Sequence, residues 1–142
     1  MEKPDLSALG DIPIDSITEV IADKYNGTKV KVKNVFTDIQ KTSWKNNVKL
    51  PEGEYVEVPV VVVETEVFGT DAKEQPLAIK EKFSLKQVGN KVGISEHPKS
   101  KARKLLKMLK INRVEEAIGR EVLIVKSVDD NNRVKLVISL PQ

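Results

Sequence analysis

The chain has 142 residues, and its 24 lysines and arginines against 21 acids give a formal net charge of +3. This length fits one domain of ordinary size, which can bury a sizeable core without disulfides. The sequence has no cysteine and one histidine, which excludes disulfides, thiolate metal sites, cysteine nucleophiles and multi-histidine metal sites. We therefore expect a non-enzymatic binding or structural module that holds no metal and no cofactor.

The first residues lack the apolar segment of a signal peptide. Apolar runs are short, as in the four valines of residues 60–63, whereas a membrane-spanning helix needs about 20 apolar residues. These features predict a cytoplasmic protein with no membrane partner. Frequent lysine, glutamate and valine are typical of thermophile proteins.

Residues 1–27 are predicted to form an N-terminal arm followed by one short helix. Residues 1–13 contain two prolines and a glycine and have no periodic pattern. Ser16 and Glu19 have the spacing of a capping box, which predicts the start of the helix, and Gly27 is expected to follow its end. The apolar residues of this helix recur at helical spacing: Ile17, Val20, Ile21 and Tyr25.

Residues 28–142 are predicted to form one mainly β domain, because apolar and polar residues alternate between turn signals. The expected strands cover residues 28–39, 54–68, 77–88, 91–94, 120–128 and 133–140. In the first strand the apolar phase slips by one residue between Val32 and Val35, which is typical of a β-bulge. Phe36 beside this slip has two possible orientations. Pro59 in the second strand indicates an edge or bulge position.

An amphipathic helix is predicted between the third and fourth main strands. Ser95 is its expected N-cap, and Pro98 lies in the first turn, where a proline needs no amide partner. Its apolar stripe is Ala102, Leu105, Leu106 and Leu109. Its basic sector is Arg103, Lys104, Lys107 and Lys110. This sector is either the solvated outside of a core helix or a surface for phosphates, an anionic membrane or an acidic partner.

The order strand, strand, strand, helix, strand, strand resembles the OB-fold, a five-stranded Greek-key barrel with a helix between strands 3 and 4. Residues 58–68, 82–85 and 101–107 are similar to small single-stranded DNA-binding proteins of phages and archaeal mobile elements. The resemblance implies that residues 28–142 form a mainly β, OB-like barrel that binds its ligand on the face of strands 2 and 3. It also implies that the loops between strands 1 and 2 and between strands 4 and 5 clamp this ligand.

Charge is segregated along the chain. Residues 29–49 carry six lysines and one acid, residues 99–113 carry seven bases and no acid, and residues 52–81 carry eight acids and two lysines. Trp44, the only tryptophan, lies in a lysine-rich predicted loop. Its ring either stacks on a base or folds back over the core. Aromatic residues make up 4% of the chain, which is few for a surface that binds bases by stacking.

We therefore predict an OB-like domain that binds single-stranded nucleic acid, DNA rather than RNA, with little sequence preference. The alternative is a protein-interaction or homodimerisation module, in which the basic helix or the acidic strand contacts an acidic protein or a second copy. The predicted nucleic-acid-binding residues are Lys41, Trp44, Lys45, Lys49, Tyr55, Lys80, Lys82, Lys86, Arg133 and Lys135.

Overall fold

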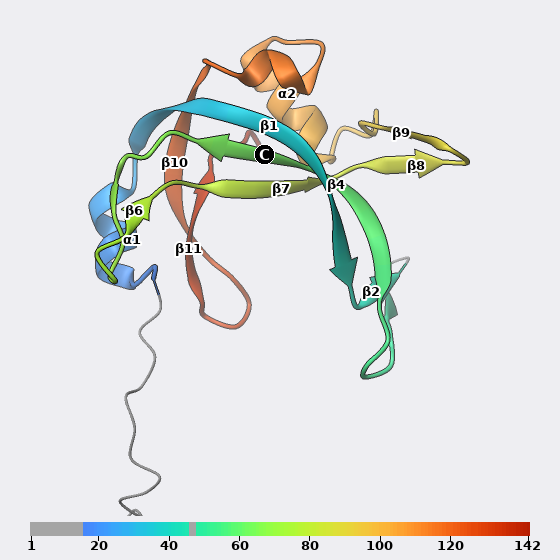
Figure 1. Ribbon diagram of the computed structural model, residues 1–142, viewed down its shortest axis with the longest axis horizontal. Coiled ribbons are helices and arrows are strands. Elements are labelled where there is room, and N and C mark those ends of the chain that lie inside the picture. The colour runs from blue at the N-terminus through green and yellow to red at the C-terminus, as the bar shows by residue number, and fades with distance from the viewer. Residues whose placement is uncertain (1–15, 46–47) are drawn as a thin grey trace, which may run out of the picture.

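The computed structural model describes residues 16–45 and 48–142, so most of the predicted N-terminal arm lies outside the described residues. Its main feature is a five-stranded antiparallel sheet in the order β11–β10–β1–β4–β7 (Figure 1). These strands are β1 (Thr28–Thr42), β4 (Val56–Thr65), β7 (Lys80–Ser84), β10 (Glu121–Val128) and β11 (Val134–Ile138). The predicted mainly β fold, with a short first helix and a second helix before the last two strands, is confirmed.

The long first strand takes part in two ladders. Residues 28–31 of β1 pair with β10, and residues 32–42 pair with β4. The register shifts between Val32 and Asn34, which confirms the predicted bulge. A bulge bends a strand and increases its twist, and β1 curves accordingly from the β10 side of the sheet to a projecting arm (Figure 1).

Within the described residues, the structure also contains three small hairpins, and the short strand predicted over residues 91–94 is confirmed as part of one of them. They are β2 (Trp44–Lys45) with β3 (Val48–Lys49), β5 (Gly69–Thr70) with β6 (Pro76–Leu77), and β8 (Lys86–Val88) with β9 (Lys91–Gly93). The prediction of one continuous strand over residues 77–88 was wrong. The backbone N–H of Leu85 donates to the carbonyl of Pro59 at 3.0 Å. Because Pro59 has no N–H to return, the ladder between β4 and β7 ends there.

The five strands do not close into the expected barrel. In the part of the chain that the structure describes, no ladder of backbone hydrogen bonds joins β7 to β11. Instead, the backbone N–H of Ile138 on β11 donates to Oε2 of Glu81 on β7 at 2.8 Å. A single side chain therefore bridges the gap that backbone pairing would fill in a closed barrel.

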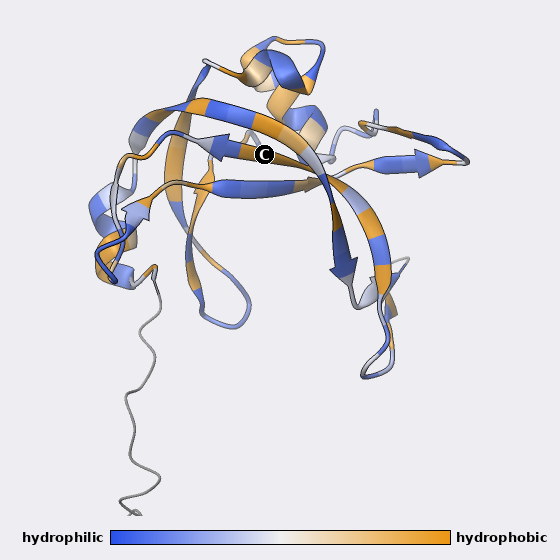
Figure 2. Ribbon diagram, viewed as in Figure 1, coloured by the Kyte–Doolittle hydropathy of each residue, from blue (hydrophilic) through white to orange (hydrophobic). Residues whose placement is uncertain are grey.

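The core lies between the inner face of the sheet and α2 (Lys101–Leu109). The apolar stripe of α2 faces the sheet, with Ala102, Leu105 and Leu106 buried as predicted. The short 3₁₀ helix η2 (Val114–Ala117) follows α2 and adds two buried side chains. Val60–Val63 is buried on both faces of β4, again as predicted. Figure 2 shows apolar and hydrophilic residues alternating along β1, as expected for a strand with one core-facing side.

The first helix, α1 (Glu19–Tyr25), packs against β10 and β11. Its N-cap is Thr18, whose Oγ1 accepts from the backbone N–H of Ile21 at 3.3 Å. The capping box predicted at Ser16 therefore does not form, and Val20, which was expected to face the core, is 76% exposed. Two hydroxyl residues close together compete for the cap position, so the sequence pattern alone does not decide where this helix begins.

The second helix also begins later than predicted. Ser100 is its N-cap and accepts from the backbone N–H of Arg103 at 3.3 Å. The residue before a proline avoids helical backbone angles, so His97 cannot continue a helix into Pro98. Ser95 instead accepts from the N–H of His97 in a turn that precedes the helix.

Candidate nucleic-acid interface

Register across three strands brings distant parts of the sequence into one surface. Phe36 on β1 pairs with Val62 on β4, and Val62 pairs with Lys82 on β7. Directly paired residues lie on the same face of a sheet. Flanking rows on this face are Asp38, Val60 and Ser84 on one side, and Asn34, Glu64 and Lys80 on the other. We call these nine residues the outer sheet face, because the alternating residues Val61, Val63 and Phe83 belong to the core.

The outer sheet face carries one exposed aromatic ring, one unpaired lysine and one unpaired acid, Asp38, among the described residues. Val60 and Val62 are buried although they lie outside the main core cluster, and Phe36 beside them is 38% exposed. Lys80 is paired with Glu64 at 3.4 Å, whereas Lys82 is exposed and makes no ion pair with any described residue. The ring of Phe36 and the ammonium group of Lys82 lie on one face with β4 between them, so the ring can stack on a base while the ammonium group pairs with a nearby phosphate.

Beyond this face, β1 and β4 continue as an arm that ends in the β2–β3 hairpin (Figure 1). We define the β1–β4 arm as residues 41–45 and 48–56. The Nζ of Lys41 lies 4.5 Å from the ring centroid of Tyr55, a cation–π contact. Trp44 is 55% exposed and is the register partner of Lys49. Trp44 therefore does not fold back over the core.

The arm does not bring all of its predicted residues to one side. Lys45 pairs with Val48, and successive residues of a strand point to opposite faces. Lys45 consequently lies on the opposite face of the hairpin from Trp44 and Lys49. The sequence placed these side chains in one loop but contained no signal for the hairpin that separates them.

The loop between β10 and β11 is held by Asp129. Its Oδ1 accepts from the backbone N–H groups of Asn131 and Arg133, each at 2.9 Å. These two hydrogen bonds, with the Arg133 one the stronger influence, lower the pKa of the Asp129 carboxyl. Lys135 lies 3.8 Å from Oδ2 of the same carboxylate. Asn132 has a φ of +59°, in keeping with the predicted hairpin loop.

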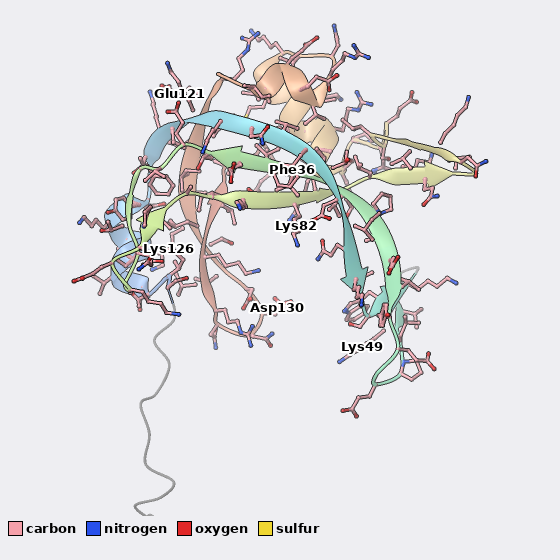
Figure 3. All side chains as sticks on the ribbon, viewed as in Figure 1. Phe36, Lys49, Lys82, Glu121, Lys126 and Asp130 are labelled. Atoms are coloured by element: carbon pink, nitrogen blue, oxygen red, sulfur yellow. The ribbon has the colours of Figure 1, made fainter. Side chains whose placement is uncertain are left out.

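Figure 3 shows how the predicted residues are distributed. Lys82 points away from β7 into the space between two projecting elements, which are the arm that carries Lys49 and the loop that carries Asp130. Lys82, on the outer sheet face, thus projects between the arm and the β10–β11 loop in this view. Lys86 is on β8, beyond the end of this face.

Phe36 is the residue that sequence reasoning missed. Its orientation was left open because it adjoins the bulge, and the register with Val62 now places it on the outer sheet face. A signal did exist in the sequence. Val35, Thr37 and Ile39 continue one phase after the slip, so the alternation already predicts that Phe36 points the other way.

Among the described residues, no three histidine or acidic side chains gather closely enough to hold a metal ion. Neither described α-helix has the length and apolar character needed to cross a membrane. Comparison with protein-family models, with curated proteins and with solved structures finds no match to this chain.

Proposed function

We propose that this protein binds single-stranded nucleic acid, DNA in preference to RNA, without catalysing a reaction. The observation that carries the proposal is the row formed by Phe36, Val62 and Lys82 across three strands. Bases stack on aromatic and apolar side chains, and lysines neutralise the phosphates between them. The exposed Phe36 ring and the Lys82 ammonium group supply one contact of each kind, on either side of the buried Val62.

The strand order supports an OB-like fold for this binding domain. An OB-fold is a partly open barrel that binds oligonucleotides on the face of strands 2 and 3 and on the loops 1–2 and 4–5. In the order β11–β10–β1–β4–β7, the second and third main strands are β4 and β7. The β1–β4 arm then corresponds to the first of these loops, and the β10–β11 loop corresponds to the second.

The exposed side chains of the surface favour binding with little sequence preference. The exposed groups that would meet a base are Phe36 and Trp44, which have no carbonyl or carboxylate to read a base edge.

Two acids on the outer sheet face oppose phosphate binding. Glu64 is neutralised by Lys80, and Asp38 accepts the N–H of Ile39 at 2.8 Å, so most of the attraction must come from Lys82 and the lysines of the arm.

Substitution of Phe36 tests the proposal directly. We expect Phe36→Ala to weaken binding of a labelled thymidine oligonucleotide by about 1–3 kcal/mol, the usual effect of removing one stacking side chain. Ile39→Ala is the matched control, because Ile39 is an exposed apolar residue of the same strand on the opposite face. Equal losses in both variants, or no oligonucleotide binding by the unmodified protein at low salt, would contradict the proposal.

A second candidate function, contact with another protein, is favoured by one observation. A cavity of about 430 Å³ lies next to Ile39 and Val92, which are 57% and 49% exposed. Exposed apolar groups that gather at a cavity often mark a protein interface. Sedimentation across a concentration range distinguishes the two functions, since a homodimer would form without nucleic acid and would be weakened by Ile39→Ala.

A further inference from the structure

A second positively charged feature lies at the free edge of β7. A cavity of about 370 Å³ opens between the end of β7, the start of β8 and the segment that leads into α2. Its polar lining consists of three lysines and three serines: Lys82, Lys86, Lys101, Ser84, Ser95 and Ser100. The cavity is many times the ~30 Å³ that a water molecule occupies in the liquid.

The charge of this cavity is not balanced by its own lining. No acid is among the described residues that line it, and within the described chain none of its three lysines makes an ion pair. Glu81 is adjacent to Lys82 on β7 but does not line the cavity. Burial raises the pKa of its carboxyl, and the hydrogen bond from Ile138 and the charges of Lys101 and Lys135 act against this shift without outweighing it. The Glu81 carboxylate accepts from the backbone N–H of Ile138, so an excess of positive charge remains at the cavity.

The serines supply donors that suit an oxyanion. Ser95 and Ser100 each accept a backbone N–H through Oγ, at 3.2 and 3.3 Å. A hydroxyl that accepts in this way keeps its own O–H available as a donor. Ammonium and hydroxyl donors around one space, without a carboxylate among them, match the two non-bridging oxygens of a backbone phosphate, which share one negative charge.

We propose that this cavity binds a backbone phosphate of the single strand where the strand leaves the outer sheet face. The inference rests on the proposed function. Lys82 and Ser84 belong both to the outer sheet face and to the cavity lining. A strand that crosses β4 and β7 along the row of Phe36 therefore meets the cavity directly after Lys82.

Inorganic phosphate is the first probe. Titration of the ¹⁵N-labelled protein, against chloride at equal ionic strength, is expected to produce saturable amide shifts at Ser84, Ser100 and Lys101. These shifts should be lost when Lys86→Gln and Lys101→Gln are combined. The matched control combines Lys91→Gln and Lys107→Gln, which removes the same charge from exposed lysines outside the cavity. Lys86→Gln alone replaces the double variant if circular dichroism shows that the double variant is unfolded.

Oligonucleotide binding is the second arm. In the variant that combines Lys86→Gln and Lys101→Gln, loss of one phosphate contact should make the slope of log K against log salt shallower by about 0.7. The slope of the control variant should not change. Absence of phosphate shifts in the unmodified protein overturns the cavity as a phosphate site. Phosphate shifts with an unchanged oligonucleotide slope overturn its place on the path of the strand. If phosphate shifts the amides but the protein binds no oligonucleotide, the proposed function and the path of the strand are both overturned. The cavity would then remain a phosphate site.

Discussion

At the scale of single residues, Glu81 has the most unusual position. It shares the core-facing phase of β7 with Phe83, and its carboxylate reaches the backbone N–H of Ile138 across the gap to β11. Burial raises the pKa of the Glu81 carboxyl. The hydrogen bond from Ile138 and the charges of Lys101 and Lys135 act in the opposite direction but do not outweigh burial.

The pH dependence of stability follows from the direction of this shift. A carboxyl whose pKa is raised by folding binds its proton more tightly in the folded protein than in the unfolded chain. Its contribution to stability is complete below the unfolded pKa and is lost as pH rises through the folded pKa. We therefore expect Glu81→Gln, which keeps an oxygen for Ile138 but cannot ionise, to be more stable than the parent at pH 7.

Urea unfolding is the measurement for this prediction. The stability difference between Glu81→Gln and the parent should disappear at about pH 3.5, below the ordinary pKa of glutamate. Glu81→Ala is the control, because it leaves the N–H of Ile138 without its acceptor and should cost about 1–3 kcal/mol. A glutamine variant that is less stable than the parent at pH 7 would show that the ionised Glu81 carboxylate itself stabilises the contact between β7 and β11.

Single residues also show what the sequence can and cannot predict. The burial of Phe83 and of Val60–Val63 could be predicted because their apolar phase is unambiguous. The half-buried position of Glu81 could not, because an acid in an apolar phase gives no indication of the partner that satisfies it. That partner, Ile138, is 57 residues away along the chain.

At the scale of elements, the arm depends on a very small hairpin. Two residue pairs join β2 to β3, and an isolated two-stranded hairpin is at best marginally stable in water. Trp44 lies in this hairpin and outside the core cluster. Its ring is therefore free to meet a ligand without cost to the packing of the core.

Trp44 provides both a signal and a test. Because it is the only tryptophan, we expect single-stranded oligonucleotide to quench the protein's indole emission. Trp44→Ala should weaken binding by about 1–3 kcal/mol with little change in unfolding, and Trp44→Phe should keep part of the affinity. Unquenched emission at saturating oligonucleotide, together with a destabilised alanine variant, would assign the ring a structural role instead.

The hairpin geometry makes the neighbouring lysines a matched pair. Lys49 is the register partner of Trp44, and Lys45 lies on the opposite face. Both are exposed lysines of the β2–β3 hairpin. Lys49→Ala is expected to lower oligonucleotide affinity more than Lys45→Ala, measured by titration at low salt. The reverse order would indicate that the strand runs along the other face of the arm.

Helices and strands were predicted well where the pattern of apolar residues extends over many residues, and poorly where it covers only a few. The five main strands and the bulge were recognised because alternation over eight or more residues is distinctive. The two-residue strands β2, β3, β5 and β6 have no period to detect. The starts of both helices were missed because neighbouring hydroxyl residues compete for one cap, and because Pro98 excludes a helix that the hydroxyl pattern alone permits.

At the scale of the whole molecule, sheet pairing mixes charges that are separate in the sequence. Residues 32–42 of the lysine-rich segment pair with residues 56–65 of the acidic segment, as in Lys41 with Glu57. The outer sheet face, to which both segments contribute, carries two acids and two lysines, so it has no net charge of its own. Binding should depend on a limited number of lysine–phosphate contacts rather than on the overall field of the protein.

The salt dependence of oligonucleotide affinity measures the number of lysine–phosphate contacts. About five phosphate contacts would give a slope of log K against log salt near −3.5, at about −0.7 for each contact on a single strand. Fluorescence titrations from low to moderate salt give this slope for the unmodified protein. An affinity that does not change with salt would exclude phosphate contacts as its source.

The open seam between β7 and β11 has a consequence for how the protein behaves in a crowded solution. A strand with one unpaired edge is a template on which a second chain can assemble into a continuous sheet and then an aggregate. β7 is short, with five residues, and the carboxylate of Glu81 is turned into the seam. Short edges and inward charges are both features that discourage such assembly. The stability that burial of Glu81 removes is thus accompanied by features that discourage aggregation at the β7 edge, one of the two outer edges of the five-stranded sheet.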